Sequence, residues 1–174
     1  MTTFRTVSTA LLCSGILCLP ALAQVGVESA LNKSKVSLHQ AISASEKSTG
    51  GTVMEIKLDE EKDAPVYEVT VLKGDAVTHY KLDGTSTASM PMENKSIVAK
   101  VVDHEGKDER IAAATAQSSL KDAVAKVEKQ TGGQAIEASI EVDDKKAQYV
   151  VEVLVGSKEV KHAVDATTGN IIAK

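Results

Sequence analysis

The 174-residue chain has little aromatic side-chain surface and very little cysteine. It contains no tryptophan, one phenylalanine and two cysteines, and aromatic residues make up 2% of it. Its core must therefore be built from Val, Ile, Leu, Ala and Met, so modules of about 60 residues should be only modestly stable. Both cysteines, Cys13 and Cys18, lie near the N-terminus. If that segment is removed, the remaining chain has no disulfide, no thiolate metal site and no cysteine nucleophile.

The chain also lacks an apolar run long enough to span a membrane. The run from Val7 to Leu19 has about 13 residues, whereas a transmembrane helix needs about 20. It follows Arg5 and precedes Ala21-Leu22-Ala23, an order of charge, apolar core and small residues that is typical of a secretory signal. We expect residues 1–23 to be a signal peptide cleaved after Ala23, which predicts a periplasmic or secreted protein without stable membrane insertion. A retained N-terminal anchor is the alternative.

Basic residues are not in excess. The chain has 20 Lys and Arg against 24 Asp and Glu, a formal net charge of −4. Nucleic acids and anionic membrane surfaces attract basic patches, so this balance argues against both as partners. A composition of 43% hydrophobic and 25% charged residues is that of an ordinary soluble globular protein.

One stretch of the sequence occurs twice. Residues 37–85 align without gaps to residues 119–167, and about a third of the paired positions are identical, which predicts a duplicated module. The shared positions include a glycine pair, a Tyr-x-Val-x-Val stretch and an aspartate. They are Gly50, Gly51, Tyr67, Val69, Val71 and Asp83 in the first copy, and Gly132, Gly133, Tyr149, Val151, Val153 and Asp165 in the second.

Each copy begins with a helical pattern and continues with strand patterns. Ser37 and Ser119 stand at N-cap positions, apolar residues follow at helical spacing, and the glycine pairs stop the helices. Short turns between the later alternating segments predict antiparallel hairpins. We expect an α+β fold of two tandem repeats, each with one helix packed on a small antiparallel sheet of three to four strands. The two sheets either stay separate or lie side by side around a pseudo-twofold axis.

The strand patterns also predict which side chains are buried. Simple alternation places Met54, Ile56 and Leu58 on one buried face, as it does Ile136, Ala138 and Ile140 in the second copy. Acidic turns should follow at residues 59–63 and 141–144. These turns lack the ligand pattern of a calcium loop, so we read them as solvated charges.

The patterns divide the chain into modules and connections. Residues 24–35 should form a loose polar leader and residues 36–102 the first module, which includes an insertion at about 86–93 because the counterpart of the last strand is displaced to 96–100. A charged linker, 103–117, leads to the second module, 118–174. Within the linker, residues 109–117 are rich in helix formers and favour an earlier start of the second helix.

The second copy closes with Val-Asp-Ala-x-Thr-Gly-x-Ile, which begins at Val164 and includes Gly169. Together with the glycine-terminated helix, the acidic hairpin and Tyr-x-Val-x-Val, this pattern resembles the PepSY domain, found in the propeptides of thermolysin-type secreted peptidases and in many bacterial envelope proteins. The first copy departs from it after Asp83. The resemblance implies a small antiparallel sheet with a packed helix and a role in binding or restraining peptidases, and it offers no catalytic residues.

No residue pattern predicts a catalytic, metal or cofactor site. The four histidines show no ligand spacing and do not recur between the copies, and neither Gly-x-Ser-x-Gly nor HExxH occurs. His162 should be a half-buried sheet residue. The rings of Tyr67 and Tyr149 should pack at the border of the core, with their hydroxyls reaching a solvent-exposed edge, rather than contact a ligand. Asp83 and Asp165 should accept hydrogen bonds from backbone amides of their own turns.

The insertion is the one segment that suggests a contact loop. Met90, Pro91 and Met92 stand at its centre, where methionine side chains suit adaptable contact with a partner. Binding of Cu(I) through the thioethers is an alternative.

These observations predict a non-enzymatic, exported protein-binding module. Its expected partner is a protein, with a peptidase of the cell envelope as the candidate that it modulates or inhibits. The competing interpretation is a periplasmic protein that binds or senses a metal ion or small ligand, and a structural spacer is a third.

Overall fold

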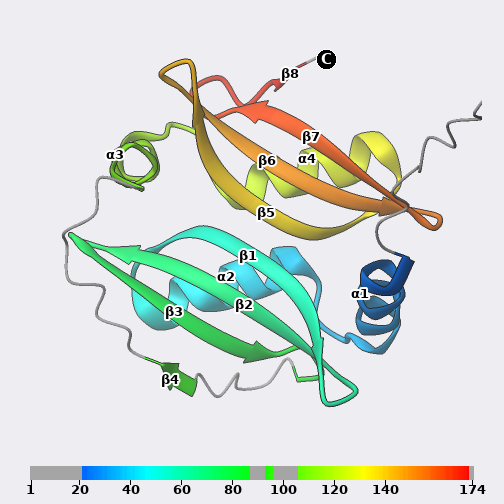
Figure 1. The fold of residues 1–174 in the computed structure, drawn as a ribbon. Coiled ribbons are helices and arrows are strands. Elements are labelled where there is room, and N and C mark those ends of the chain that lie inside the picture. Colours follow the sequence, from blue (N-terminus) through cyan, green and yellow to red (C-terminus); the bar gives the residue numbers. More distant parts are fainter. Residues whose placement is uncertain (1–20, 87–92, 96–105, 173–174) are drawn as a thin grey trace, which may run out of the picture.

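A computed structural model describes residues 21–86, 93–95 and 106–172. The described residues form two halves with the same order, two helices followed by four strands (Figure 1). The first half comprises α1 (Ala21–Lys33), α2 (Leu38–Thr49), β1 (Thr52–Glu61), β2 (Ala64–Lys73), β3 (Ala76–Asp83) and β4 (Glu93–Lys95). The second half comprises α3 (Lys107–Thr115), α4 (Leu120–Thr131), β5 (Gln134–Asp143), β6 (Lys146–Val155), β7 (Lys158–Asp165) and β8 (Ile171–Ile172).

The two predicted helices begin and end as their sequences indicate. The Ser37 hydroxyl accepts a hydrogen bond from the Gln40 amide, and Ser119 does the same for Asp122. Gly50 and Gly132 end the helices with φ of 64° and 70°, a conformation that costs glycine little. The second glycine of each pair has a different reason, because a Cβ on Gly51 would lie 2.6 Å from the Leu72 carbonyl oxygen and one on Gly133 would lie 2.8 Å from that of Leu154.

All eight strands belong to one antiparallel sheet in the order β4-β3-β2-β1-β5-β6-β7-β8. β1 and β5 join the halves through three residue pairs, with Ile56 opposite Ala138 at the centre. Because these two residues are counterparts in the repeat, the pseudo-twofold axis passes between them. The predicted α+β tandem repeat is confirmed, and the two sheets lie side by side as one.

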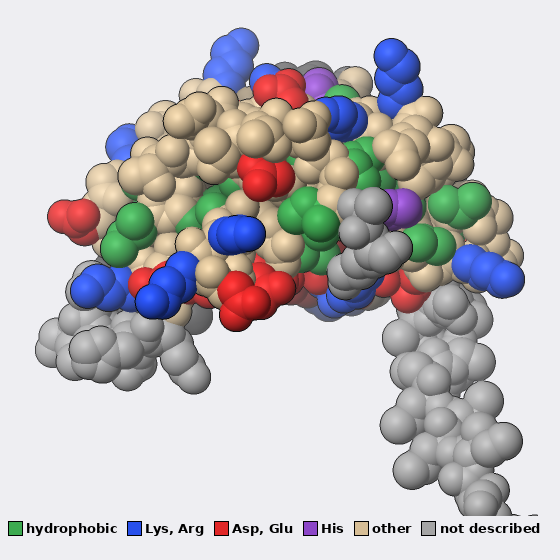
Figure 2. All heavy atoms as spheres, turned by 90° about the horizontal axis from the view of Figure 1, so that it is seen from above, with side chains coloured by type: hydrophobic (Ala, Val, Ile, Leu, Met, Phe, Trp, Pro, Cys, Tyr) green, Lys and Arg blue, Asp and Glu red, His purple; other side chains and the backbone are tan. Residues whose placement is uncertain are grey.

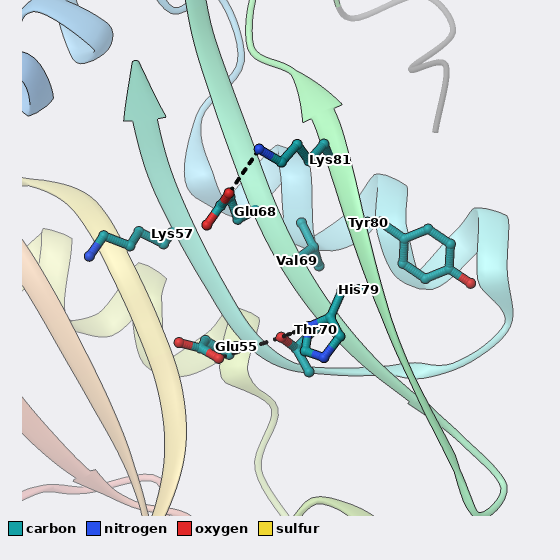
Figure 3. A pocket seen from close by; sticks show the side chains of 8 residues that line it. All are labelled: Glu55, Lys57, Glu68, Val69, Thr70, His79, Tyr80 and Lys81. Atoms are coloured by element: carbon teal, nitrogen blue, oxygen red, sulfur yellow. Dashed lines mark hydrogen bonds and ion pairs between the residues drawn. The ribbon is translucent and has the colours of Figure 1, made fainter. Parts of the chain in front are cut away.

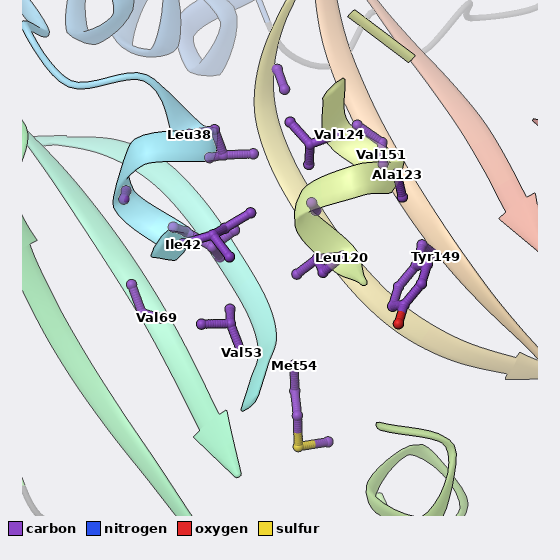
Figure 4. Close-up of a cluster of buried hydrophobic side chains, with 14 of the residues drawn as sticks. Leu38, Ile42, Val53, Met54, Val69, Leu120, Ala123, Val124, Tyr149 and Val151 are labelled. Atoms are coloured by element: carbon purple, nitrogen blue, oxygen red, sulfur yellow. The ribbon is translucent and has the colours of Figure 1, made fainter. Parts of the chain in front are cut away.

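A single core lies between the sheet and the helices. α2 and α4 cover the same face of the sheet, here called the helix face, and contact each other across the pseudo-twofold axis. Leu38 and Ile42 of α2 and Leu120 and Val124 of α4 point toward the space between them (Figure 4). These side chains are at most 3% exposed and belong to one hydrophobic cluster with residues of both halves. Each module therefore completes the core of the other.

The segments before each module are helical. α1 contains most of the expected leader, so the prediction that residues 24–35 are loose is wrong, and α3 lies within the expected linker, 103–117. α1 packs on β1 and β2 and α3 on β5 and β1, with Ala30 and Ala112 buried. The two helices lie at opposite ends of the junction between the modules, where β1 and β5 diverge (Figure 1). The module limits, 36–102 and 118–174, stay predictions.

Simple alternation fails near the start of β1 and β5. An irregularity between Val53 and Glu55 admits one extra residue, and Val53 and Met54 are both buried. The same irregularity between Ala135 and Glu137 buries Ala135 together with Ile136. The alternation predicted from Met54 and Ile136 therefore missed Val53 and Ala135, because a bulge has no signature in hydrophobic periodicity.

The acidic segments lie mostly within strands. β1 continues to Glu61 and β5 to Asp143, so the turns contain only residues 62–63 and 144–145, all with positive φ. The wider acidic turns predicted at 59–63 and 141–144 are thus wrong. The first module's fourth strand is Glu93–Lys95, whereas residues 96–100, predicted to form it, lie outside the described residues.

The tyrosines fasten the start of each module to its sheet. The Tyr67 hydroxyl donates to the Val36 carbonyl oxygen at 2.5 Å and the Tyr149 hydroxyl to that of Ser118 at 2.6 Å. Both rings are buried, and burial raises the pKa of Tyr149 to about 12. The expectation that these hydroxyls reach a solvent-exposed edge is wrong, because each of them donates its hydrogen bond to a backbone carbonyl oxygen within the protein.

The aspartates close the turns after β3 and β7. Asp83 accepts from the Thr85 amide at 2.7 Å, and Asp165 accepts from the amides of Thr167 and Thr168 at 2.9 and 2.7 Å, as predicted. Gly169 has φ of 66°, and its amide donates a hydrogen bond to the Asp165 carbonyl oxygen.

Within the described residues, no helix is both long and apolar enough to cross a membrane. Acidic and basic side chains are interspersed on the side seen from above in Figure 2.

Replacing one core leucine should weaken both modules. Leu120→Ala should lower the free energy of unfolding by about 2–5 kcal/mol, because it leaves a cavity in the shared core. Hydrogen exchange should show faster opening of the β2 amides of Val69 and Val71 as well as of β6. Faster exchange confined to the second module would contradict a shared core.

The tyrosine hydrogen bond can be tested by removing one oxygen. Tyr67→Phe removes one of two donors to the Val36 carbonyl oxygen, because the Ser34 hydroxyl also donates to it at 2.7 Å, and should cost about 0.5–1.5 kcal/mol in urea unfolding. Tyr80→Phe is the matched control, because the Tyr80 hydroxyl makes no hydrogen bond within the described part of the chain. Equal costs for the two variants would show that the hydrogen bond is not the cause.

Stability should depend on the charge of Asp165. Backbone hydrogen bonds, first from Thr168, lower the pKa of this carboxyl group, so its stabilising effect is present above the unfolded-state pKa of about 3.9 and is lost as the pH falls through the lower folded-state value. Asp165→Asn should therefore lower the melting temperature at pH 6 and converge with the wild type near pH 2. A difference that stays constant over this range would rule out the charge as its origin.

Candidate functional site

The face of the sheet opposite α2 and α4, here called the open face, is polar. Residues opposite each other in the sheet share a face, so the register defines two neighbouring rows. The first row runs from β3 to β7 as Lys81, Glu68, Lys57, Glu137, Glu152 and Lys161. The second runs as His79, Thr70, Glu55, Ser139, Val150 and Ala163.

The first row is a ladder of charges across six strands. Lys81 pairs with Glu68 at 3.0 Å, Lys57 with Glu137 at 3.2 Å, and Lys161 with Glu152 at 3.2 Å. The hydrogen bond to Glu137 raises the pKa of Lys57, so this lysine, which bridges the two modules, stays charged over the ordinary pH range. Such partly exposed pairs contribute only about 0–1 kcal/mol each, so the ladder matters more as a surface pattern than for stability.

The second row joins three polar groups in the first module. Thr70 Oγ1 lies 3.1 Å from His79 Nδ1 and donates to Glu55 Oε2 at 3.4 Å (Figure 3). A threonine hydroxyl has one proton, so a Thr70 that donates to Glu55 can only accept from His79. A catalytic base must instead accept the proton of the nucleophile. The arrangement orders side chains on the surface and does not activate Thr70.

These residues surround a hollow of about 310 Å³ on the open face of β1, β2 and β3. Its polar walls are the side chains of the two rows, whereas Val69 and Tyr80 point away from them (Figure 3). The lining side chains are Glu55, Lys57, Glu68, Val69, Thr70, His79, Tyr80 and Lys81. Two lysines face two glutamates there, so the charge of this first hollow is balanced.

A second hollow, of about 470 Å³, adjoins the first at Glu55 and Thr70. It lies between the sheet and the N-terminal end of α3, at the junction of the modules. Four carboxylates line it against one guanidinium group: Glu55, Glu109, Glu137 and Glu141 against Arg110. The open face thus changes from balanced to acidic toward the junction.

The second module does not repeat this surface. His79, Thr70 and Glu55 correspond to Lys161, Glu152 and Glu137. Lys81, Glu68 and Lys57 correspond to Ala163, Val150 and Ser139, so two of the six polar positions become apolar and a third loses its charge. Glu68 and Thr70 are the variable positions of Tyr67-x-Val-x-Val. Sequence reasoning missed them because it followed the shared residues, although the differences at alternate positions were visible.

Apart from Val69, which lines the first hollow, the residues singled out from the sequence lie elsewhere. The glycines, tyrosines, valines and aspartates of the repeat belong to the helix ends, the core and the turns described above. His162 is half-buried on β7, opposite Val151, as predicted. Met90, Pro91 and Met92 lie outside the described residues. Among the described residues, no three His, Cys, Asp or Glu side chains converge as a metal site would require.

Comparison with known proteins gives one family and one distant structure. The crystal structure of a Clostridium difficile 630 protein, described as a putative lipoprotein, matches over 80% of this chain and 92% of its own, with 16% sequence identity and a TM-score of 0.42. That likeness is too distant to bear on fold or function. No curated protein matches the sequence.

The family comparison covers both halves of the chain. Residues 35–86 and residues 117–174 each match the PepSY family, described as "Peptidase propeptide and YPEB domain". Each match contains one capped helix and the strands that follow it, and together they account for more than half of the sequence. The chain therefore belongs to the PepSY family and carries two PepSY domains in tandem.

Proposed function

We propose that the protein is exported, binds a protein partner without catalysing a reaction, and lowers the activity of that partner, a peptidase of the cell envelope. The observation that carries the proposal is the pair of adjoining hollows on the open face of the first module. The two domains share the repeated core motif but differ in the side chains of the open face. A surface that only contacted solvent would not need a distinct set of interacting side chains in one domain.

The chemistry of the hollows favours a protein partner over a small molecule. Small-molecule sites are mostly apolar and enclosed, whereas these hollows lie open and are lined by side chains of both charge signs. Alternating charges give specificity to an interface between proteins. The acidic second hollow suits a lysine or arginine of the partner, and the balanced first hollow suits polar residues beside it.

The peptidase is inferred from the family and from the signal-like N-terminus. The family's description names peptidase propeptides, and residues 1–23 have the charge, apolar and small-residue order of a secretory signal. Export predicts that the protein recovered outside the cytoplasm begins at Gln24, which intact-mass measurement can check.

The site can be tested with a photo-crosslinking amino acid at two equivalent positions. Placed at His79, it should capture an envelope peptidase, whereas at Lys161, the counterpart in the second domain, it should not. The purified protein should then lower the kcat/KM of that peptidase. Equal capture from both positions, or capture without any effect on cleavage, would contradict the proposal.

A charge reversal tests the role of the hollows directly. Glu55 lines both of them, so Glu55→Lys should weaken binding of the captured peptidase at least tenfold. Gln130→Lys places a lysine at an exposed position of α4, on the opposite side of the sheet, and should leave binding unchanged. Binding of a metal ion or small ligand, the competing function, would instead raise the melting temperature of the purified protein when that ligand is added.

A further inference from the structure

The outermost strands, β4 and β8, cover the outer edges of β3 and β7 to different extents. β4 pairs with residues 79–81 in the middle of β3, whereas β8 pairs only with Ala163 and Val164 near the end of β7. Among the described residues, no strand pairs with the outer edge of Lys158–His162. An edge of this kind presents unpaired N–H and C=O groups and can take on another strand.

Alternation along β7 shows which backbone groups point to the outer edge that no strand of the described residues covers. The Asp165 amide points away from β6 and donates to the Asn170 carbonyl, and the next amide, of Ala166, points inward to the Ala147 carbonyl. Backbone groups of alternate residues point the same way in a strand. Glu159 and Lys161 therefore direct their N–H and C=O groups outward, four groups in all.

Exposed hydrophobic side chains surround the same segment. Val160 is 38% exposed at its centre, Val155 is 39% exposed and pairs with Lys158 at one end, and Ile172 is 40% exposed and pairs with Ala163 at the other. Ile111 of α3 is the other exposed large hydrophobic of the described residues. Val155 and Val160 lie on the helix face and Ile172 lies on the open face, so exposed apolar surface borders this edge on both faces of the sheet.

We infer that the edge of β7 pairs with β7 of a second copy of this chain, antiparallel and around a twofold axis at Val160. In this register Glu159 of each copy lies opposite Lys161 of the other. Both members of each pair direct their backbone groups outward, so two pairs form four hydrogen bonds. The unlike charges attract at the same positions, and the sequence is therefore complementary to itself.

The centre of the register suits valine. Val160 and its symmetry mate form a non-hydrogen-bonded pair, whose Cα atoms approach to about 4.5 Å and whose side chains lie closest. The twofold axis also brings the end of the segment near Val155 in one copy to the end near Ile172 in the other. The open face of the first domain stays free, so dimerisation does not depend on the proposed function.

The dimer should be weak. Five residues of strand and three apolar side chains bury less than the roughly 1,200 Å² typical of stable interfaces, so we expect a dissociation constant on the order of 10–100 µM. Sedimentation equilibrium between about 5 µM and 1 mM should show a reversible monomer–dimer transition. A monomer at every concentration in this range would overturn the inference.

Two charge variants test the register. Glu159→Lys alone brings two lysines opposite each other in every cross-strand pair, and Lys161→Glu alone brings two glutamates together, so each variant should dimerise at least tenfold more weakly. An equimolar mixture of the two variants should regain dimers, because each of the two cross-strand pairs then joins a lysine of one copy to a glutamate of the other. Circular dichroism should first confirm that both variants are folded. Wild-type dimerisation by both single variants would exclude this register.

Cysteine crosslinking gives a readout that does not depend on charge. With Cys13 and Cys18 replaced by serine, Val160→Cys should form a disulfide-linked dimer under mild oxidation, because residue 160 meets itself at the axis. Lys158→Cys is the matched control on the same face of the same strand, two residues from the axis, and should crosslink at least tenfold more slowly. Equal rates would overturn the proposed axis.

Discussion

The structure depends on the antiparallel pairing of β1 with β5. This pairing is only three residues long, yet it places two like strands with Ile56 opposite Ala138 and turns two small sheets into one. Once the sheets are continuous, α2 and α4 must lie side by side on the same face and share a core. A chain with almost no aromatic residues gains most from this arrangement, because burying two modest apolar faces against each other compensates for the small area that each valine or alanine contributes.

The same pairing explains why the junction is closed by helices. The bulges at Val53/Glu55 and Ala135/Glu137 raise the local twist, so β1 and β5 separate on either side of their short contact. α1 and α3 fill the two openings, and each buries an alanine, Ala30 or Ala112, where a larger side chain would keep helix and sheet apart. Their contacts differ, because α1 packs on β1 and β2 of its own half, whereas α3 packs on β5 and on β1 of the other half.

Local order was predictable from the sequence, and long-range order was not. The N-cap serines, the glycine stops and the short hairpin turns act within a few residues, so they could be predicted from the local sequence. The bulges, the close approach of Gly51 to Leu72 and the Tyr67 hydrogen bond to Val36 depend on neighbours that only the fold supplies. α1 was missed, and α3 was expected only as an earlier start of the second helix, because the buried surface of each is a few alanines rather than an apolar stripe. The open-face site was missed for another reason, since the search followed identities between the copies whereas Glu68 and Thr70 lie at positions where they differ.

The difference between the two outer edges follows from the lengths of two connections. Residues 166–170 form a short connection, so β8 begins to pair at Val164, next to the turn, and its two described residues extend the pairing to Ala163. Residues 84–92 form a longer connection, which allows β4 to reach the middle of β3 and to cover residues 79–81. The longer connection of the first half therefore has an architectural consequence. It protects the outer edge of the domain whose open face carries the proposed partner site, while the shorter connection in the second copy leaves the edge of β7 available for pairing.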